Sequence, residues 1–100
     1  MIVITRHAVP PEDTDGFLDR SAAALEVLGG RPGFKGSWVG RAADEPTLWT
    51  VVTEWEGPGY YRRALSDFEV RMAAVPLLSQ AQDEPTAFEV VSRHRPGGDR

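Results

Sequence analysis

The segment TLWTVVTEWE, residues 47–56, is a strand pattern with apolar side chains on both of its faces. Successive side chains of a strand point to opposite faces, so Trp49 and Trp55 share one face while Leu48 and Val52 share the other. Each exposed aliphatic or aromatic side chain would cost about 1.5 to 3 kcal/mol. A sheet built around this segment must therefore be covered on both sides.

The chain before this segment reads as a strand followed by a helix. Residues 2–9 are rich in β-branched side chains and end at Pro10 and Pro11, which lack the amide donors that a strand needs. Asp13 or Thr14 is suited to cap a following helix, which stops at a pair of glycines. The apolar positions expected on one side of this helix are Phe17, Leu18, Leu25 and Leu28.

The middle of the chain predicts a hairpin and then a second helix. Residues 34–42 and 47–56 flank the polar turn ADEP, which favours an antiparallel pair of strands. Pro58 suits the first position of a helix that ends by Pro76. The apolar stripe expected on that helix is Tyr61, Leu65, Phe68, Met72 and Val75.

Two further features complete the pattern of elements. Ser66 and Glu69 have the spacing of a capping box, so the second helix is expected to break and restart at Ser66. Residues 87–94, AFEVVSRH, predict a fourth strand. The expected domain covers residues 1–95, and residues 96–100 are expected to form a loose tail.

The resulting order β-α-β-β-α-β predicts an α+β, ferredoxin-like fold: a four-stranded antiparallel sheet with two helices on one face. Helices can cover only one side of this sheet, and the other side is also at least half apolar. We therefore expect a homodimer in which two sheets pack back to back.

Composition and charge restrict the class of partner. The net charge is -4, the pI is near 5.1 and the arginines are scattered among acids, so nucleic acid is not an expected partner. There is no cysteine, which excludes disulfides and thiolate metal sites. No apolar run approaches the ~20 residues that cross a bilayer, and no signal-peptide pattern is present at the start, so we expect a cytoplasmic protein without a membrane partner.

Three stretches, GFKGSW, VVTEWEGPGYYRRAL and EPTAFEV, make the chain resemble the antibiotic biosynthesis monooxygenase family of dimeric α+β barrels. The resemblance spans residues 2–92. It implies a cofactor-independent enzyme that uses molecular oxygen to oxidise an aromatic small molecule, such as a polyketide-type phenol, anthrone or hydroquinone. The same family also contains haem-degrading enzymes, quinol oxygenases and members without known activity.

The resemblance also implies roles for particular residues. Trp55 matches a tryptophan at the end of strand three in anthrone-oxidising members, and Tyr61 matches their tyrosine on helix two. Val51 stands where those members tend to carry an asparagine, and Thr5 stands where several carry another. Ala64 and Ala74 match the tryptophan and the histidine ligand that haem-degrading members need, so haem degradation is not expected.

The residues themselves suggest a site formed by the odd-numbered side chains of the strands expected at residues 2–9 and 47–56. His7 is the candidate base because a neutral imidazole accepts a proton near pH 7. Together with Trp55 and Tyr61 it forms the expected catalytic group. The expected substrate-binding residues are Thr5, Trp49, Val51, Phe68, Arg71 and Met72. The tryptophans would stack on a planar substrate, Phe68 and Met72 would close the space, and Arg71 would hold an anionic oxygen.

Other readings of these residues stay open at the level of sequence. A strand histidine is often structural, and Trp49 and Tyr61 also suit a core. His7 and His94 are the only histidines and have no metal-binding spacing, so neither a metal nor a cofactor is expected. The alternatives to a monooxygenase are a polyketide cyclase or isomerase on the same scaffold, and a metabolite-binding or accessory dimer without catalytic activity.

Overall fold

A computed structural model, which describes residues 1–97, contains one four-stranded sheet. The strands are β1 (Ile2–Ala8), β2 (Phe34–Ala42), β3 (Glu45–Trp55) and β4 (Ala87–Phe88). Their order in the sheet is β2-β3-β1-β4, and every neighbouring pair is antiparallel. This arrangement confirms the ferredoxin-like fold that the sequence predicts.

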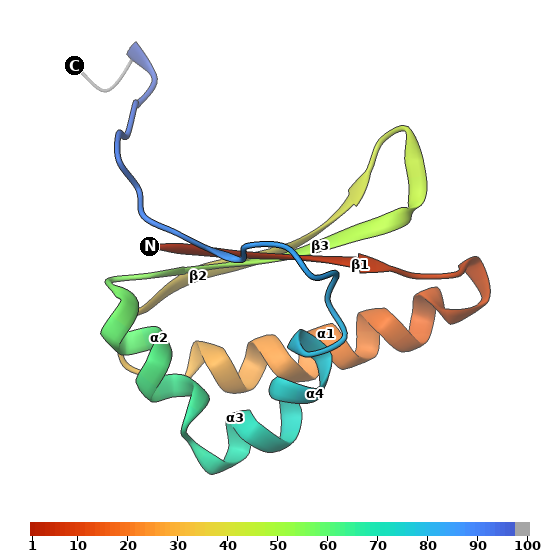
Figure 1. The fold of residues 1–100 in the computed structure, drawn as a ribbon, viewed down its shortest axis with the longest axis horizontal. Coiled ribbons are helices and arrows are strands. Elements are labelled where there is room, and N and C mark those ends of the chain that lie inside the picture. The colour runs from red at the N-terminus through yellow and green to blue at the C-terminus, as the bar shows by residue number, and fades with distance from the viewer. Residues whose placement is uncertain (98–100) are drawn as a thin grey trace.

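The helices lie together on one side of the sheet (Figure 1). They are the short 3-10 helix η1 (Pro11–Asp13) and the helices α1 (Thr14–Gly29), α2 (Pro58–Leu65), α3 (Phe68–Ala73) and α4 (Val75–Leu78). We call the covered side of the sheet the helix face and the other side the open face. In the part of the chain that the structure describes, no helix has the length and apolarity needed to cross a membrane.

Helix α1 has the predicted bounds but a different buried stripe. Its buried residues are Phe17, Ser21, Ala24 and Leu28, which follow a four-three-four spacing. The expectation that Leu18 shares this face is wrong, because Leu18 is exposed. Asp13 does not cap the helix through its side chain; its carboxylate instead bonds Arg20 at 3.0 Å. Small side chains at two of the four positions let α1 lie close to the sheet.

The second predicted helix is divided into three. Asp67 has an extended backbone conformation, and its carboxylate accepts a hydrogen bond of 3.3 Å from the amide of Val70, so it is the N-cap of α3. The predicted break is therefore present, but the cap is Asp67 rather than Ser66. The Ser66 hydroxyl donates to the carbonyl of Arg63 at 2.7 Å instead. Pro76 lies in the first turn of α4, where a missing amide donor is tolerated.

This division changes which side chains of the second helical region face the sheet. The expectation that Phe68 and Met72 point into the core is wrong, because they are 74% and 65% exposed. The buried positions are Ala64, Val70, Ala74 and Leu77. The helical period restarts after the break at Asp67. A stripe predicted for one continuous helix therefore assigns the wrong residues to the buried face after the break.

The fourth strand is much shorter than the predicted residues 87–94. Ile2 pairs with Phe88 and Val3 pairs with Ala87, in antiparallel register. Because β1 begins at Ile2, a longer β4 would run past the start of its only neighbour. Residues 89–97, the C-terminal arm, are exposed and continue on the side of the sheet away from the helices (Figure 1). Part of the predicted loose tail, residues 98–100, lies outside the described residues.

One glycine fixes the contact between the start of β2 and the start of α2. Gly33 has a φ of 85°, in the left-handed region that favours glycine. A Cβ at this position would overlap the ring of Tyr60. The carbonyl of Gly33 also accepts a hydrogen bond of 2.8 Å from the amide of Glu56. The turn before β2 and the end of β3 therefore hold α2 in place.

Candidate active site

Six side chains expected to share one face of β1 and β3 are all buried on the helix face. They are Thr5, His7, Trp49, Val51, Thr53 and Trp55. The strand register places them in rows, with His7 opposite Trp49 and Thr5 opposite Val51. The assignment of the odd-numbered face to the helix side is therefore confirmed, because two-residue alternation holds along both strands.

His7 is bonded to the neighbouring side chain on its own strand. Its Nε2 lies 2.9 Å from Thr5 Oγ1, and that hydroxyl lies 3.4 Å from the carbonyl oxygen of Val51. If the hydroxyl donates to the carbonyl, it must accept from Nε2–H, and this tautomer satisfies both contacts. Nδ1 then carries the lone pair. Burial lowers the pKa of His7, so the imidazole is neutral at pH 7.

Phe17 was expected on the apolar side of α1, but sequence reasoning did not include it in the site. Its ring centroid lies 5.3 Å from that of His7 and 5.7 Å from that of Trp49. Phe17 therefore fills the space between the candidate base and one of the candidate stacking residues. Its spacing from Ser21, Ala24 and Leu28 is the signal that could have identified it, because small residues at helical spacing indicate close packing.

A second aromatic group lies at the other end of β3. Trp55 packs edge to face against Phe34 with centroids 5.3 Å apart, and its centroid is 5.5 Å from that of Tyr61. Its indole N–H donates to Thr53 Oγ1 at 2.8 Å. Burial raises the pKa of Tyr61, so its phenol keeps the proton and can act as a donor.

The remaining predicted site residues add no polar side chain beside these groups. Val51 is buried in the middle of the helix face and offers no polar group in its side chain. Arg71 is exposed on α3, beside Met72. Phe68 and Met72 are exposed, so they do not close a space beside His7.

The surface pockets of residues 1–97 include three that lie away from His7. The first, of about 230 Å3, is lined by Arg6, Gly40, Arg41, Ala42, Leu48, Trp49 and Thr50. The second, of about 290 Å3, lies between Glu26 of α1 and Asp67 of α3, and the third, of about 250 Å3, lies between α1 and α4 beside Met72. Neither His7 nor Tyr61 lines any of these three. The ring of Phe17 packs against His7 instead, so a side chain fills the helix face beside His7.

No group of three or more histidine, aspartate and glutamate side chains able to hold a metal ion is found among residues 1–97. The groups that the site does offer are one neutral imidazole, one phenol, two indoles and several hydroxyls. These groups can accept and donate protons and can stack on a planar molecule.

A fold of this order, with a buried aromatic face behind the sheet, is that of a ferredoxin-like α+β protein. The family model described as antibiotic biosynthesis monooxygenase matches residues 1–65, which is more than half of the chain. The protein belongs to this monooxygenase family. The matched region includes the whole sheet except β4, and it contains His7, Trp49, Trp55 and Tyr61. No match to a curated protein sequence was found.

Solved structures share the fold at low sequence identity. A protein from Deinococcus radiodurans, described as a candidate antibiotic biosynthesis monooxygenase, has a TM-score of 0.74 and 16% identity, with 95% of this chain and 96% of that chain covered. SnoaB from Streptomyces nogalater, a cofactor-independent oxygenase solved as a point mutant, has a TM-score of 0.69 and 20% identity, with 81% and 82% covered. A conserved protein from Methanosarcina mazei Go1 has a TM-score of 0.69 and 22% identity, with 86% and 84% covered. These similarities show the fold.

Proposed function

We propose that the protein is a cofactor-independent monooxygenase of the cytoplasm that oxidises a phenolic or anthrone-like aromatic molecule with molecular oxygen. The observation that carries the proposal is the neutral His7, buried beside Thr5 on a face that also holds Trp49 and Trp55. A dry, aromatic surface with one base suits a planar substrate that must lose a proton before it reacts with oxygen.

For an anthrone-like CH2 group, the reaction begins with loss of a proton. His7 Nδ1 takes this proton from the substrate, and the resulting anion gives one electron to O2, which forms a substrate radical and superoxide. These two recombine to form a C–O bond, and the peroxide takes up the proton from His7. Loss of water then breaks the O–O bond and leaves a new C=O group. One oxygen atom enters the product, and the other leaves as water.

Trp55, with Tyr61 packed against it, lies six residues along β3 from the row of His7, about 20 Å away at ~3.3 Å per residue, so the two contact the same substrate as His7 only if it extends along the strand. The phenol of Tyr61 keeps its proton and could donate to a substrate oxygen that gains negative charge. Trp55 offers its ring, because its N–H is already used by Thr53. Val51 supplies no amide, so this chain depends on hydroxyl and imidazole groups for the hydrogen bonds that an asparagine would make.

A second candidate function is binding of a metabolite without catalysis, as a carrier or accessory dimer. The packing of Phe17 against His7 and Trp49 leaves the helix face filled, which favours the accessory role over a carrier, because a carrier also needs a cavity for its ligand. Under the first proposal, Phe17 must move for the substrate to reach His7.

Oxygen uptake separates these functions. With an anthrone or a substituted hydroquinone and labelled O2, a monooxygenase consumes oxygen and places one labelled atom in the product. His7→Gln should lower kcat by about 100-fold or more, the range for loss of a general base. His94→Gln is the matched control, because His94 is exposed and bonds only Ser92 among residues 1–97. Binding without oxygen uptake would reject the oxidation and favour the carrier.

We also propose that the protein is a homodimer through its open face. Trp38 is 54% exposed there, beside Ile4 and Val52 in the same row of the sheet. The C-terminal arm carries the exposed Val90 and Val91, and Arg93 of the arm bonds Glu54 at 2.6 Å. A second copy of the sheet would cover this apolar surface and give the strand-like sequence of the arm a partner.

A further inference from the structure

Two of the surface pockets lie one after the other along the same flank of α1. The pocket of about 250 Å3 includes Arg20 and Ala23, and the pocket of about 290 Å3 includes Val27 and Gly30. These residues are three, four and three apart, so they follow one stripe of the helix. The opposite wall is formed by α3 and α4. We call the two pockets together the helix groove, whose α1 wall is about 15 Å long at ~1.5 Å per residue.

One end of the helix groove is apolar. Ala23 of α1 faces a wall of apolar side chains there, which are Met72, Ala73, Pro76 and Leu77. Met72 is largely exposed, and so is Phe68, which lies one turn before it on α3. Single exposed apolar side chains are ordinary, but several gathered at one groove mark a surface that binds another molecule. This end of the groove therefore has the composition of a binding surface.

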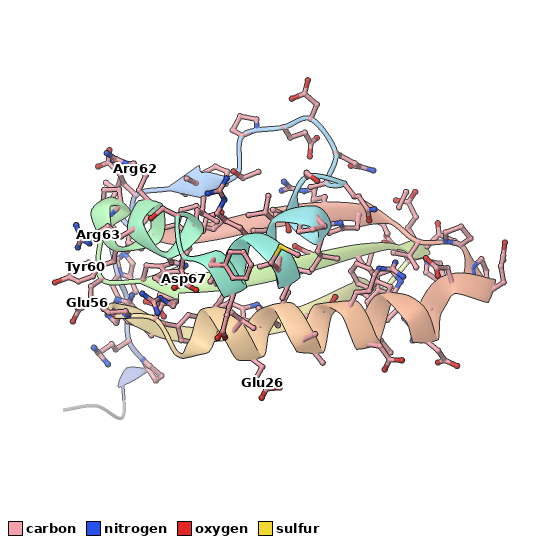
Figure 2. The ribbon with its side chains drawn as sticks, turned by 90° about the horizontal axis from the view of Figure 1, so that it is seen from below. Glu26, Glu56, Tyr60, Arg62, Arg63 and Asp67 are labelled. Atoms are coloured by element: carbon pink, nitrogen blue, oxygen red, sulfur yellow. The ribbon has the colours of Figure 1, made fainter. Side chains whose placement is uncertain are left out.

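The other end of the helix groove carries negative charge. Glu26 of α1 and Glu69 of α3 line it, and neither carboxylate forms an ion pair among residues 1–97. A third carboxylate, that of Asp67, pairs with Arg31 at 3.3 Å. Figure 2 looks onto the helices and shows Glu26 on α1 and Asp67 at the start of α3. Two unpaired carboxylates at the end of an apolar groove favour a partner that is apolar along its length and basic at one end.

The walls of the groove favour a helix over an extended segment as the occupant. Backbone N–H and C=O groups in the middle of α1 are bonded within the helix, so this wall offers none to an extended peptide. A helix satisfies its own backbone and presents apolar side chains every three or four residues. The groove is about three helical turns long. An amphipathic helix therefore matches it in length and in pattern.

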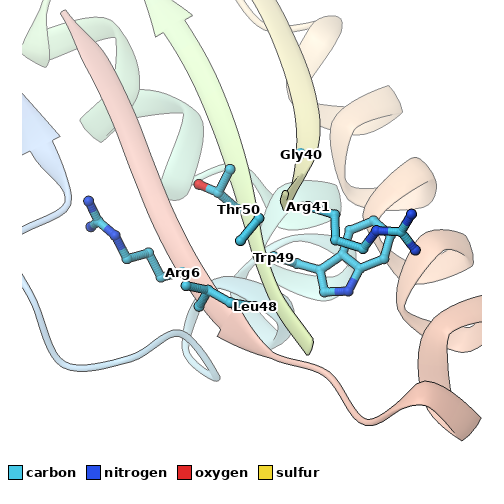
Figure 3. A pocket seen from close by; sticks show the side chains of 7 residues that line it. Arg6, Gly40, Arg41, Leu48, Trp49 and Thr50 are labelled. Carbon is cyan, nitrogen blue, oxygen red and sulfur yellow. The ribbon is translucent and has the colours of Figure 1, made fainter. Parts of the chain in front are cut away.

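The pocket of about 230 Å3 belongs to a different surface. Figure 3 shows it at β1, β2 and β3, with Arg6, Leu48 and Thr50 among its side chains. Arg6 and Thr50 pair with each other and alternate with buried residues, so they lie on the open face, which the proposed homodimer covers. The helix groove lies between helices on the other side of the sheet and is free in such a dimer.

We propose that the helix groove binds an amphipathic helix of another protein, one with apolar side chains at helical spacing and a lysine or arginine beside Glu26 and Glu69. A membrane surface is the poorer match, because anionic lipids would repel these carboxylates. The groove residues lie outside the strands, so this contact does not depend on the proposed oxidation. The protein would then bind its own copy through the sheet and a second protein through the helices.

Fluorescence anisotropy with two designed peptides tests the proposal. Both peptides carry leucines at helical spacing; one ends in lysines, and its charge-reversed match ends in glutamates. The lysine peptide should bind saturably and gain helical circular dichroism signal, and the glutamate peptide should bind about fivefold more weakly. This difference should disappear in about 1 M salt, where the screening length is ~3 Å. No saturable binding, or equal affinity for both peptides at low salt, would overturn the proposal.

Met72→Glu places a charge in the apolar end and should weaken binding of the lysine peptide by about tenfold or more. Leu18→Glu is the matched control, because Leu18 is also an exposed apolar residue but lines neither part of the groove. Both positions are exposed, so both variants should fold, which thermal unfolding verifies. Equal affinity in Met72→Glu and the native protein would overturn the location.

Glu69→Lys should weaken binding of the lysine peptide and strengthen that of the glutamate peptide. Glu45→Lys is its control, since Glu45 is exposed at the start of β3 and should change neither affinity. An unchanged preference in Glu69→Lys would overturn the assigned charge of the partner.

Two other occupants of the groove have their own signatures, and either would overturn the proposal. Binding to phosphatidylglycerol vesicles that Met72→Glu abolishes would assign the groove to a lipid surface. An assembly larger than a dimer in sedimentation, lost in Met72→Glu, would assign it to a second copy of this chain.

Discussion

The indole nitrogen of Trp55 donates a hydrogen bond of 2.8 Å to Thr53 Oγ1, and both side chains are buried. Two residues apart on β3, they share the helix face, so one side chain fixes the orientation of the other. The ring of Trp55 is thereby held between Phe34 and Tyr61. This relationship makes Thr53 a positioning residue for the aromatic group near the candidate site.

Replacing Thr53 by valine should lower the free energy of unfolding by about 1 to 3 kcal/mol, because it leaves the Trp55 N–H without an acceptor while the volume is kept. Urea denaturation measures the change. Thr47→Val is the control, since Thr47 is an exposed residue of the same strand. Equal stability of the two variants would show that the Trp55 hydrogen bond contributes nothing.

Stability should fall as pH falls below about 6.5. Burial lowers the pKa of His7 from 6.5 in the folded state, so the unfolded chain takes up a proton first and is favoured in that window. Above pH 6.5 both states are neutral at this residue, and its effect vanishes. Urea denaturation between pH 5 and 8 should show a shallower slope in His7→Gln than in the native protein. An identical slope would mean that His7 is not buried as a neutral group.

Phe17→Ala should lower the free energy of unfolding by about 3 to 5 kcal/mol, the usual range for removal of a buried phenylalanine. The neighbouring Leu18→Ala should change it by less than about 1 kcal/mol, because Leu18 is exposed. Thermal or urea denaturation of both variants compares the two positions. A larger loss for Leu18→Ala than for Phe17→Ala would show that Leu18 is a buried residue of α1, as the sequence pattern suggested.

The phase of the second helical region has its own test. Val70 is fully buried and Phe68 is 74% exposed, so Val70→Ala should destabilise the protein by about 1.5 to 3 kcal/mol. Phe68→Ser should lower stability by less than about 1 kcal/mol and should improve solubility. A larger loss of stability for Phe68→Ser than for Val70→Ala would mean that Phe68 is buried, as it would be if residues 58–75 formed one unbroken helix.

Association through the open face predicts a concentration dependence. Sedimentation should give a dimer for the native protein and mostly monomer for Trp38→Glu, which places a charge in the apolar row of Ile4 and Val52. Glu12→Lys is the control, because Glu12 is exposed in η1, outside the strands of the sheet. A native protein that sediments as a monomer at micromolar concentration would contradict the dimer.

The sequence predicts this fold well where structure depends on local pattern. The alternation of β3 identifies the helix face, and the proline pair after β1 and the glycine pair at the end of α1 mark where those elements end. Residues 34–42 have the same bounds in the prediction and in the structure. These features depend on side chains close together in the chain, so their pattern is visible without the tertiary structure.

The features that the sequence does not predict depend on pairing between strands far apart in the chain, or on which residues of a helix face the sheet. The length of β4 is set by where β1 begins, which is a property of another element. The exposure of Phe68 follows from the cap at Asp67, since one extended residue resets the helical period. The pairing of Arg41 with Trp49 depends on strand register, and register is not fixed by composition. A cross-strand neighbour of a candidate site residue can therefore be one that no local motif marks.

The contact between Gly33 and Tyr60 ties two distant positions of the chain to each other. A residue other than glycine at position 33 would have to adopt an unfavourable backbone angle, and it would also require a smaller side chain at position 60. Among natural relatives, drift at these two sites should therefore be correlated: a lost glycine should be accompanied by a lost aromatic ring. A design that reorients α2 can begin at Gly33, because a side chain added there would displace the ring of Tyr60.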